Sequence, residues 1–383
     1  MILLTLQIAE FLKTQFEAFS LSKIINKMKK ILYFSLISML LLSDNCQSQT
    51  PPARSKVRRE VEAYRQSAQT AADSFLNPRL SEATRLAVIA PHPFVYTDEQ
   101  AIAFRRIVAN NKESPRIRAA ALGRLYNYLP KDRELEALTF GFLRNKKDDP
   151  LLRQAAFGAL KALSFSKFST VDAQDDIKDI LRSLTDDANI EFRRYALENL
   201  VARGDDAARQ LLISGAESAS GTPLNVVDCL KTLSFDNKPA NFQPTAYKVF
   251  QRNDDRQVRL TAIRLLGGYK PAEAPLSILL ADPKSDPNER RAALGALYAG
   301  NRSSILMLAT GLLKNEADKD DDLKAIAVQM AMYYRQSAEQ RRKSTAIEFD
   351  RILNQLVNNS LLADTSVLKQ ASQRYLDVVK PKF

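Results

Sequence analysis

The sequence predicts an all-α fold in which about eight to nine helix–turn–helix repeats stack into a right-handed α-solenoid. Three observations favour this class. The 383 residues include only 11 Gly and no Trp, while strong helix formers are plentiful. One residue pattern recurs nine times, at intervals of 31 to 45 residues. Each copy spaces its apolar residues as one face of a helix, and such a face needs a neighbouring helix to cover it.

The N-terminus has the organisation of a secretory signal peptide over residues 28–48. Residues 28–30 form a short basic start, and twelve mostly apolar residues, 31–42, come before a polar stretch. The small residues Cys46 and Ser48 place the cleavage site directly after Ser48. The chain is therefore expected to be exported, to the periplasm or to the outer membrane.

Residues 1–27 lie outside that pattern and are interpreted as an upstream mis-start or an N-terminal extension, with Met28 as the true start. A buried or membrane-anchoring helix is the alternative. Cys46 is a candidate lipid anchor, although Ser-Asp-Asn before it matches poorly the residues that usually precede a lipidated Cys. In the mature chain we expect an N-terminal helical arm over 49–77, repeats over 78–383 and no transmembrane helix.

The copies align on one position, which we call the anchor. The anchors are Arg85, Arg118, Arg153, Arg193, Val226, Arg259, Arg290, Lys324 and Lys369. Four residues before each anchor stands a short polar side chain of the kind that caps a helix N-terminus. These predicted caps are Ser81, Ser114, Asp149, Asn189, Thr222, Asp255, Asp286, Asp320 and Thr365. The pattern therefore predicts that a helix begins in every copy.

Each anchor helix is also predicted to bury one face. The positions three, four and seven residues after the anchor are small or apolar in most copies, and they share one side of a helix. The first and last copies differ most, with His92 and Gln373 at these positions. We expect this of terminal repeats, because one side of each faces water.

A second helix is predicted between successive copies. The predicted segments are 98–112, 131–146, 171–184, 206–217, 243–252, 271–281, 301–316 and 337–358. Thr97 and Gln100 have the spacing of a capping box at the start of the first segment. Proline residues interrupt most of the connections, which favours separate helices. Helix pairs of this period stack into a superhelix.

The pattern Asp-x-x-φ-Arg-x-x-Ala-φ-x-x-Leu (φ, apolar), present at 149–160 and 255–266, resembles the HEAT repeat, particularly its short bilin-lyase-like subtype. The resemblance covers roughly residues 78–380. It implies that Asp and Arg side chains form a hydrogen-bond ladder between repeats, weaker at Val226 and Lys324, where the Arg is replaced. The expected ladder residues are Arg118, Asp149, Arg153, Arg193, Asp255, Arg259, Asp286 and Arg290.

The sequence offers no catalytic residues, cofactor site or metal site. Two cysteines, Cys46 and Cys229, and one histidine, His92, are too few for a disulfide framework or for most zinc sites. Cys229 is expected to pack in the core, with a reactive thiol as the alternative. Acidic clusters such as 318–322 lack the Gly and Glu of a calcium loop and are expected to cap helices.

The formal charge of +12 suggests an anionic partner without naming one. Two basic runs are candidates for contact with phosphate or an anionic lipid headgroup, and solvated helix faces are the alternative reading. The first run holds Arg54, Lys56, Arg58 and Arg59, and the second holds Arg341, Arg342 and Lys343.

These observations favour a non-enzymatic protein-binding or scaffolding module of the bacterial cell envelope. Its second helices would line a concave face that holds a protein or peptide partner. One alternative is a nucleic-acid-binding protein that resembles HEAT-like DNA glycosylases, against which stand the lack of Trp and the export signal. The other is an enzyme resembling bilin lyases, for which the chain lacks a Cys/His constellation.

Overall fold

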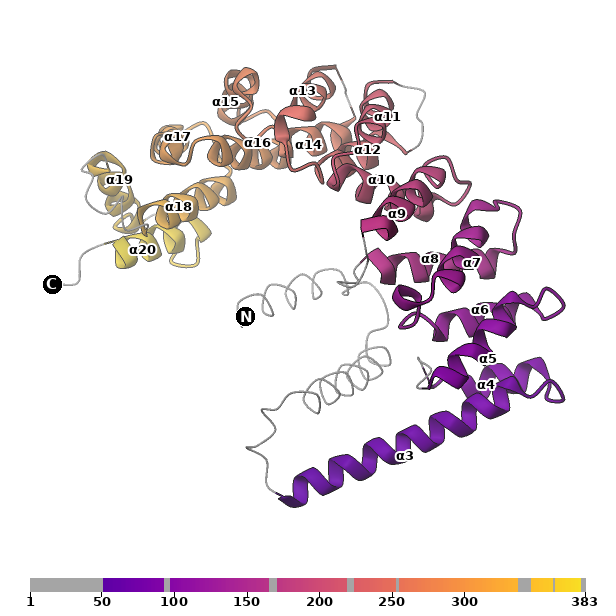
Figure 1. The fold of residues 1–383 in the computed structure, drawn as a ribbon. Helices are drawn as coiled ribbons and strands as arrows, with labels where there is room; N and C mark the ends of the chain where they lie inside the picture. Colours follow the sequence, from indigo (N-terminus) through magenta and orange to yellow (C-terminus); the bar gives the residue numbers. More distant parts are fainter. Residues whose placement is uncertain are drawn as a thin grey trace. The chain divides into compact units, whose positions relative to one another are not determined.

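The structure is a computed structural model that describes residues 51–92, 97–164, 171–218, 224–252, 255–336, 346–360 and 362–379. This part of the chain contains eighteen α-helices, α3 to α20, four 3-10 helices, η2 to η5, and no strand (Figure 1). The prediction of an all-α fold is confirmed. The predicted signal peptide, the extension before it and Cys46 lie outside the described residues.

The chain divides into two compact units, residues 1–104 and 105–383. Helices that contain an anchor, which we call anchor helices, alternate with second helices. The anchor helices are α4 (Glu82–Ile89), α6 (Pro115–Arg124), α8 (Pro150–Ser164), α10 (Ile190–Ala202), α12 (Val226–Leu233), α14 (Arg256–Arg264), α16 (Pro287–Gly300), α18 (Asp321–Gln336) and α20 (Val367–Val379).

The second helices lie close to the predicted segments. They are α5 (Asp98–Ala109), α7 (Arg133–Arg144), α9 (Val171–Ser183), α11 (Asp206–Glu217), α13 (Gln243–Arg252), α15 (Glu273–Ala281), α17 (Ile305–Lys314) and α19 (Ile347–Val357). Four of them follow a 3-10 turn: η2 (Leu129–Lys131), η3 (Pro239–Asn241), η4 (Lys270–Ala272) and η5 (Arg302–Ser304). Of the predicted segment 337–358, the first nine residues, 337–345, lie outside the described chain.

Most anchor helices begin at the predicted cap. Asp255, for example, accepts the backbone N–H groups of Gln257 at 2.8 Å and Val258 at 3.0 Å. Such a cap contributes about 1 kcal/mol, because the first N–H groups of a helix have no partner within it. The side chains that accept in this way are Ser81, Ser114, Asp149, Asn189, Asp255, Asp286 and Asp320.

Two predicted caps are wrong. Helix α12 begins at Val226, with Asn225 rather than Thr222 as its cap, and Asn225 accepts the N–H of Asp228 at 2.8 Å. Helix α20 begins after Ser366, one residue beyond Thr365. In both places a residue with a stronger capping preference follows the Thr, and the helix starts at the stronger cap.

In the first unit, the 26-residue helix α3 (Pro51–Leu76) packs on α4. Phe75 of α3 stacks on Phe104 with ring centroids 5.0 Å apart. The first copy was expected to face water on one side, but its His92 is buried and the ring of His92 lies 5.5 Å from that of Tyr64. The reason is that α3 covers this end of the helix pair, a contact that the repeat pattern does not include.

In the second unit, from α7 onward, each second helix packs on the anchor helix that follows it, and most successive anchor helices also pack on one another. The residues three, four and seven positions after the anchors fill this core, as predicted; Ala262, Ile263 and Leu266 of the α14 copy are at most 1% exposed. In the last copy Gln373 is exposed, as expected.

Successive anchor helices run in the same direction. At their N-terminal ends, Arg256 of α14 pairs with Asp286 before α16 at 2.7 Å. At their C-terminal ends, the backbones of Gly268 and Gly300 come together so closely that a Cβ on Gly300 would lie 2.7 Å from the Gly268 nitrogen. Gly268 also has a φ of +79°, which other residues rarely adopt.

We expect the substitution Gly300→Ala to lower the free energy of unfolding by about 1–3 kcal/mol, because the added methyl group meets backbone that cannot yield. Gly295→Ala in the same helix is the control. A Cβ there meets nothing within 4 Å, so that substitution should stabilise the protein by about 0.5–1 kcal/mol. Urea denaturation of both variants measures the two changes, and equal effects would contradict the close approach.

Candidate functional site

The anchor side chains satisfy the carbonyl groups at the end of the helix that precedes them. Arg118 Nε donates to the carbonyl of Val108 at 2.9 Å, and Arg290 Nε to that of Leu280 at 3.0 Å, in each case ten residues earlier. The last carbonyls of a helix have no partner within it and form the negative end of the helix dipole. The same bond is made by Arg85 to Phe75, Arg153 to Leu143, Arg259 to Phe250, Lys324 to Asn315 and Lys369 to Asn359.

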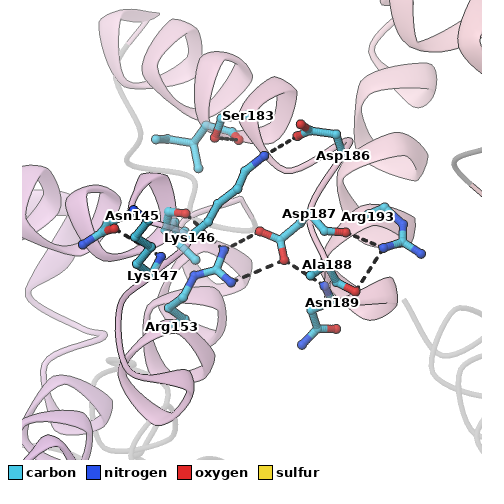
Figure 2. A network of polar contacts seen from close by, with 12 residues as sticks. Asn145, Lys146, Lys147, Arg153, Ser183, Asp186, Asp187, Ala188, Asn189 and Arg193 are labelled. Atoms are coloured by element: carbon cyan, nitrogen blue, oxygen red, sulfur yellow. Dashed lines mark hydrogen bonds and ion pairs between the residues drawn. The ribbon is translucent and has the colours of Figure 1, made fainter.

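Several anchors also bind an acid that precedes the next anchor helix. Arg153 donates to both carboxylate oxygens of Asp187, which is fully buried (Figure 2). Asp187 also accepts the N–H of Asn189 at 2.9 Å, and its carbonyl accepts from Arg193. Beside it Lys146 pairs with Asp186 at 2.6 Å. One polar network therefore joins α7, α8 and the start of α10.

Arg290 repeats this arrangement further along the chain. It donates to both oxygens of Asp318, and the two side chains are nearly inaccessible to solvent. Asp318 accepts the N–H of Asp320 at 3.0 Å, and its carbonyl accepts from Lys324 Nζ at 2.7 Å. Arg259 donates in the same way to both oxygens of Glu289, at 3.0 Å each.

The electrostatics of these acids follow from their donors. Burial by itself raises the pKa of Asp187, but the hydrogen bonds from Arg153 and from the Asn189 N–H outweigh it, so its pKa is lowered. The hydrogen bond from Arg290 is the largest influence on Asp318, and its pKa is lowered as well. Both groups are therefore carboxylates at neutral pH and compensate the buried guanidinium groups.

A ladder between anchor helices is thus present, with acids other than those expected. Asp149, Asp255 and Asp286 accept N–H groups at the start of their own helices, and Asp286 also pairs with Arg256 of α14. A second acid meets Arg153, Arg259 and Arg290, because a buried charge without a partner is costly. Arg118, which is also buried, contacts the carbonyl of Val108 and the ring of Phe142. The signal in the sequence was an acid two residues before the cap, as in Asp187 and Asp318, or one residue before the anchor, as in Glu289.

One expected ladder residue and the copy without an anchor Arg form other contacts. Arg193 donates to the carbonyls of Asp187 and Ala188 in the loop before its own helix. In the copy whose anchor is Val226, the neighbouring position provides the link, since Arg194 of α10 pairs with Asp228 of α12 at 2.7 Å.

The second helices carry their own series of ion pairs. In each, an Arg of a second helix bonds an acid in the loop after the next anchor helix. The pairs are Arg105–Asp132 at 3.1 Å, Arg182–Asp205 at 2.8 Å and Arg209–Asp236 at 2.6 Å. Asp205 and Asp236 are buried, and burial raises their pKa less than the hydrogen bonds that they accept lower it.

Of the two basic runs predicted to contact anions, only one side chain lies in the described part of the chain. The side chains of Arg54, Lys56 and Arg58 lie outside the described residues, as do Arg341, Arg342 and Lys343, whereas Arg59 is exposed on α3. Cys229 is buried, and burial raises the pKa of its thiol to about 11. The thiol is protonated at neutral pH and packs in the core as expected.

Within the described ranges, no three His, Cys, Asp or Glu side chains cluster as metal ligands would. In the same part of the chain, no helix has both the length and the apolar composition needed to cross a bilayer.

The most exposed apolar side chains lie on three successive second helices. Ile278 of α15, Met307 of α17 and Ile347 of α19 are 72%, 70% and 74% exposed, respectively. We call these three residues the apolar row. Each would gain about 1.5–3 kcal/mol from full burial, so these three are the strongest candidate contact residues in the described chain.

Comparison with known proteins gives no further assignment. No protein-family model matches the chain, and no curated protein matches it at a significant level.

We expect Asp318→Asn to lower the free energy of unfolding at neutral pH by about 3–5 kcal/mol, because it leaves Arg290 buried without a counter-charge. The control is Asp322→Asn, which removes a carboxylate 3.6 Å from Arg291 that is 64% exposed. That loss should stay below about 1 kcal/mol. Urea denaturation compares the two, and similar values would show that burial of the ladder contributes nothing.

The ladder also sets a dependence on pH. A carboxyl group whose pKa is lower in the folded state stabilises the protein above its unfolded pKa of about 4, and this contribution disappears as the pH falls through the folded value. Since Asp187 and Asp318 both have lowered pKa values, stability should fall between about pH 5 and the acid limit of folding. The slope of the unfolding free energy against pH should be shallower for Asp318→Asn, and an unchanged slope would contradict the assignment.

Proposed function

We propose that the chain is a HEAT-like repeat protein, a right-handed solenoid of eight to nine repeats, which acts as a non-enzymatic scaffold of the bacterial cell envelope. The observation that carries the proposal is the apolar row of Ile278, Met307 and Ile347 on successive second helices. Its partner is a protein or peptide with a complementary apolar stretch.

The pairing of charged side chains between successive helices supports a scaffold. Arg153, Arg259 and Arg290 direct their charges into contacts between successive helices, so they hold the array together and leave little for a ligand. The second helices retain an exposed face that these contacts do not occupy. Scaffolds built from stacked helix pairs bind partners over such extended faces.

The apolar row also fits the anatomy of a protein interface. Interfaces have an apolar centre with a polar rim, and beside Ile347 the exposed pair Lys314–Glu348 provides a rim. The proposed placement in the envelope rests on the signal-peptide pattern at 28–48.

Site-specific crosslinking in the native host tests the proposal. A photo-reactive amino acid at position 307 should capture one dominant envelope protein, identified by mass spectrometry. Capture should fall at least about ten-fold with Ile278→Ser and Ile347→Ser, since burial of each side chain contributes more than 1 kcal/mol.

The control places the same amino acid at Leu151, which is 47% exposed on an anchor helix. It should not capture this partner. If both positions captured the same set of proteins, or mainly cytoplasmic proteins, the proposal of an envelope scaffold would be wrong.

A further inference from the structure

Five exposed basic side chains gather at the C-terminal ends of three successive anchor helices and in the loops that follow them. They are Lys231, Lys238, Arg264, Lys270 and Arg302, which we call the basic edge. Neither of the basic runs singled out in the sequence includes any of them.

Contacts between the three loops place this edge on one side of the array. Gln243, at the start of α13, donates to the carbonyls of Leu265 and Gly267 in the loop after α14. Gly268 of that loop meets Gly300 at the end of α16. The loops after α12, α14 and α16 are therefore consecutive neighbours.

Among the described residues, one of the five bases forms an ion pair with an acid, Lys270 with Glu273. Asp236 is 5% exposed and is held by Arg209 and Asn241, so it faces inward. Glu273 pairs with Lys270, whose side chain remains 82% exposed. Among the described residues, Lys231, Lys238, Arg264 and Arg302 have no ion pair within 4 Å.

Helix dipoles account for two of the five bases. Lys231 and Arg264 lie in the last turn of a helix, where a cation is favoured by the helix dipole. Lys238, Lys270 and Arg302 lie instead at the three-residue turns η3, η4 and η5, one in each loop. Each of the three loops therefore presents an exposed cation that a ligand can reach.

An exposed aromatic ring accompanies the bases. Phe235 is 53% exposed and lies between Lys231 and Lys238 in the sequence. The nearby rings of Tyr269 and Tyr298 are only partly exposed, and Arg302 covers the Tyr298 ring at 6.0 Å from its centroid. One free ring suits shallow insertion into a lipid headgroup region. Binding of a single-stranded nucleic acid would need several exposed aromatic rings, on which successive bases stack.

We propose that the basic edge docks on an anionic phospholipid surface. Lys238, Lys270 and Arg302 bind the lipid phosphates, and Phe235 enters the headgroup region beside them. This inference is independent of the partner that the apolar row binds, because the two surfaces use different residues on different elements.

Flotation with vesicles tests the proposal on the protein in the form that its host produces. The protein should float with phosphatidylcholine vesicles that contain phosphatidylglycerol, and not with phosphatidylcholine alone. The variant Lys238→Gln, Lys270→Gln, Arg302→Gln should bind roughly 100-fold more weakly, because each base near an anionic bilayer contributes about five-fold. Phe235→Ser should remove most of the binding that survives high salt.

The matched control is Lys112→Gln, Lys147→Gln, Lys284→Gln. It makes the same change in charge at exposed loop positions that precede anchor helices, at the opposite end of the helices. It should bind as the unmodified protein does. Equal loss in both triple variants, or no preference for phosphatidylglycerol, would overturn the proposal and leave only a general effect of net charge.

Competition with inorganic phosphate and with single-stranded DNA shows whether the basic edge binds lipid phosphates, a free anion or a nucleic acid. Inorganic phosphate at constant ionic strength should leave the protein on the vesicles, and release at that point would assign the edge to a free anion instead. Tighter binding of single-stranded DNA than of vesicles, lost in the basic-edge variant, would likewise refute the lipid assignment. Crosslinking at position 307 should be unchanged by the basic-edge variant, so failure of one proposal is distinguishable from failure of the other.

Discussion

The structure depends on a buried cation that has partners on both sides of it. Arg290, 1% exposed, bonds the carbonyl of Leu280 behind it and the carboxylate of Asp318 ahead of it. Arg153 does the same with Leu143 and Asp187. A buried guanidinium that lost these partners would cost several kcal/mol, so each of these two anchors fixes the helix before it and the loop after it. The apolar faces supply the burial, and the anchors specify the register between successive helices.

This constraint explains how the charges are distributed. Carboxylates near the anchors accept hydrogen bonds from N–H groups and guanidinium groups inside the array, as Asp286, Asp318 and Glu289 do. At the other end of the helices several basic side chains, such as Lys238 and Arg302, form no ion pair with an acid of the described chain and stay exposed. Part of the net charge of +12 is therefore structural.

The sequence predicted the alternation of helices closely, down to the bounds of α11 and α13. Caps and amphipathic faces act over a few residues, so local spacing is enough to locate them. Where two residues could cap the same helix, the predicted cap was wrong, since α12 and α20 begin directly after Asn225 and Ser366 and not after the expected Thr residues. The candidate surfaces were not predicted, because exposure depends on which faces the neighbouring helices leave uncovered.

The sequence by itself determined the all-α class, the order of the helices and the basic anchors, because these follow from periodic, local interactions. Only the tertiary structure decided which acid meets each anchor, as with Glu289 and Arg259. It also decided that α3 buries His92 and that Gly268 meets Gly300. Each of these contacts joins residues roughly 30 positions apart, and the distance between such residues is fixed by how whole helices pack, which no local pattern encodes.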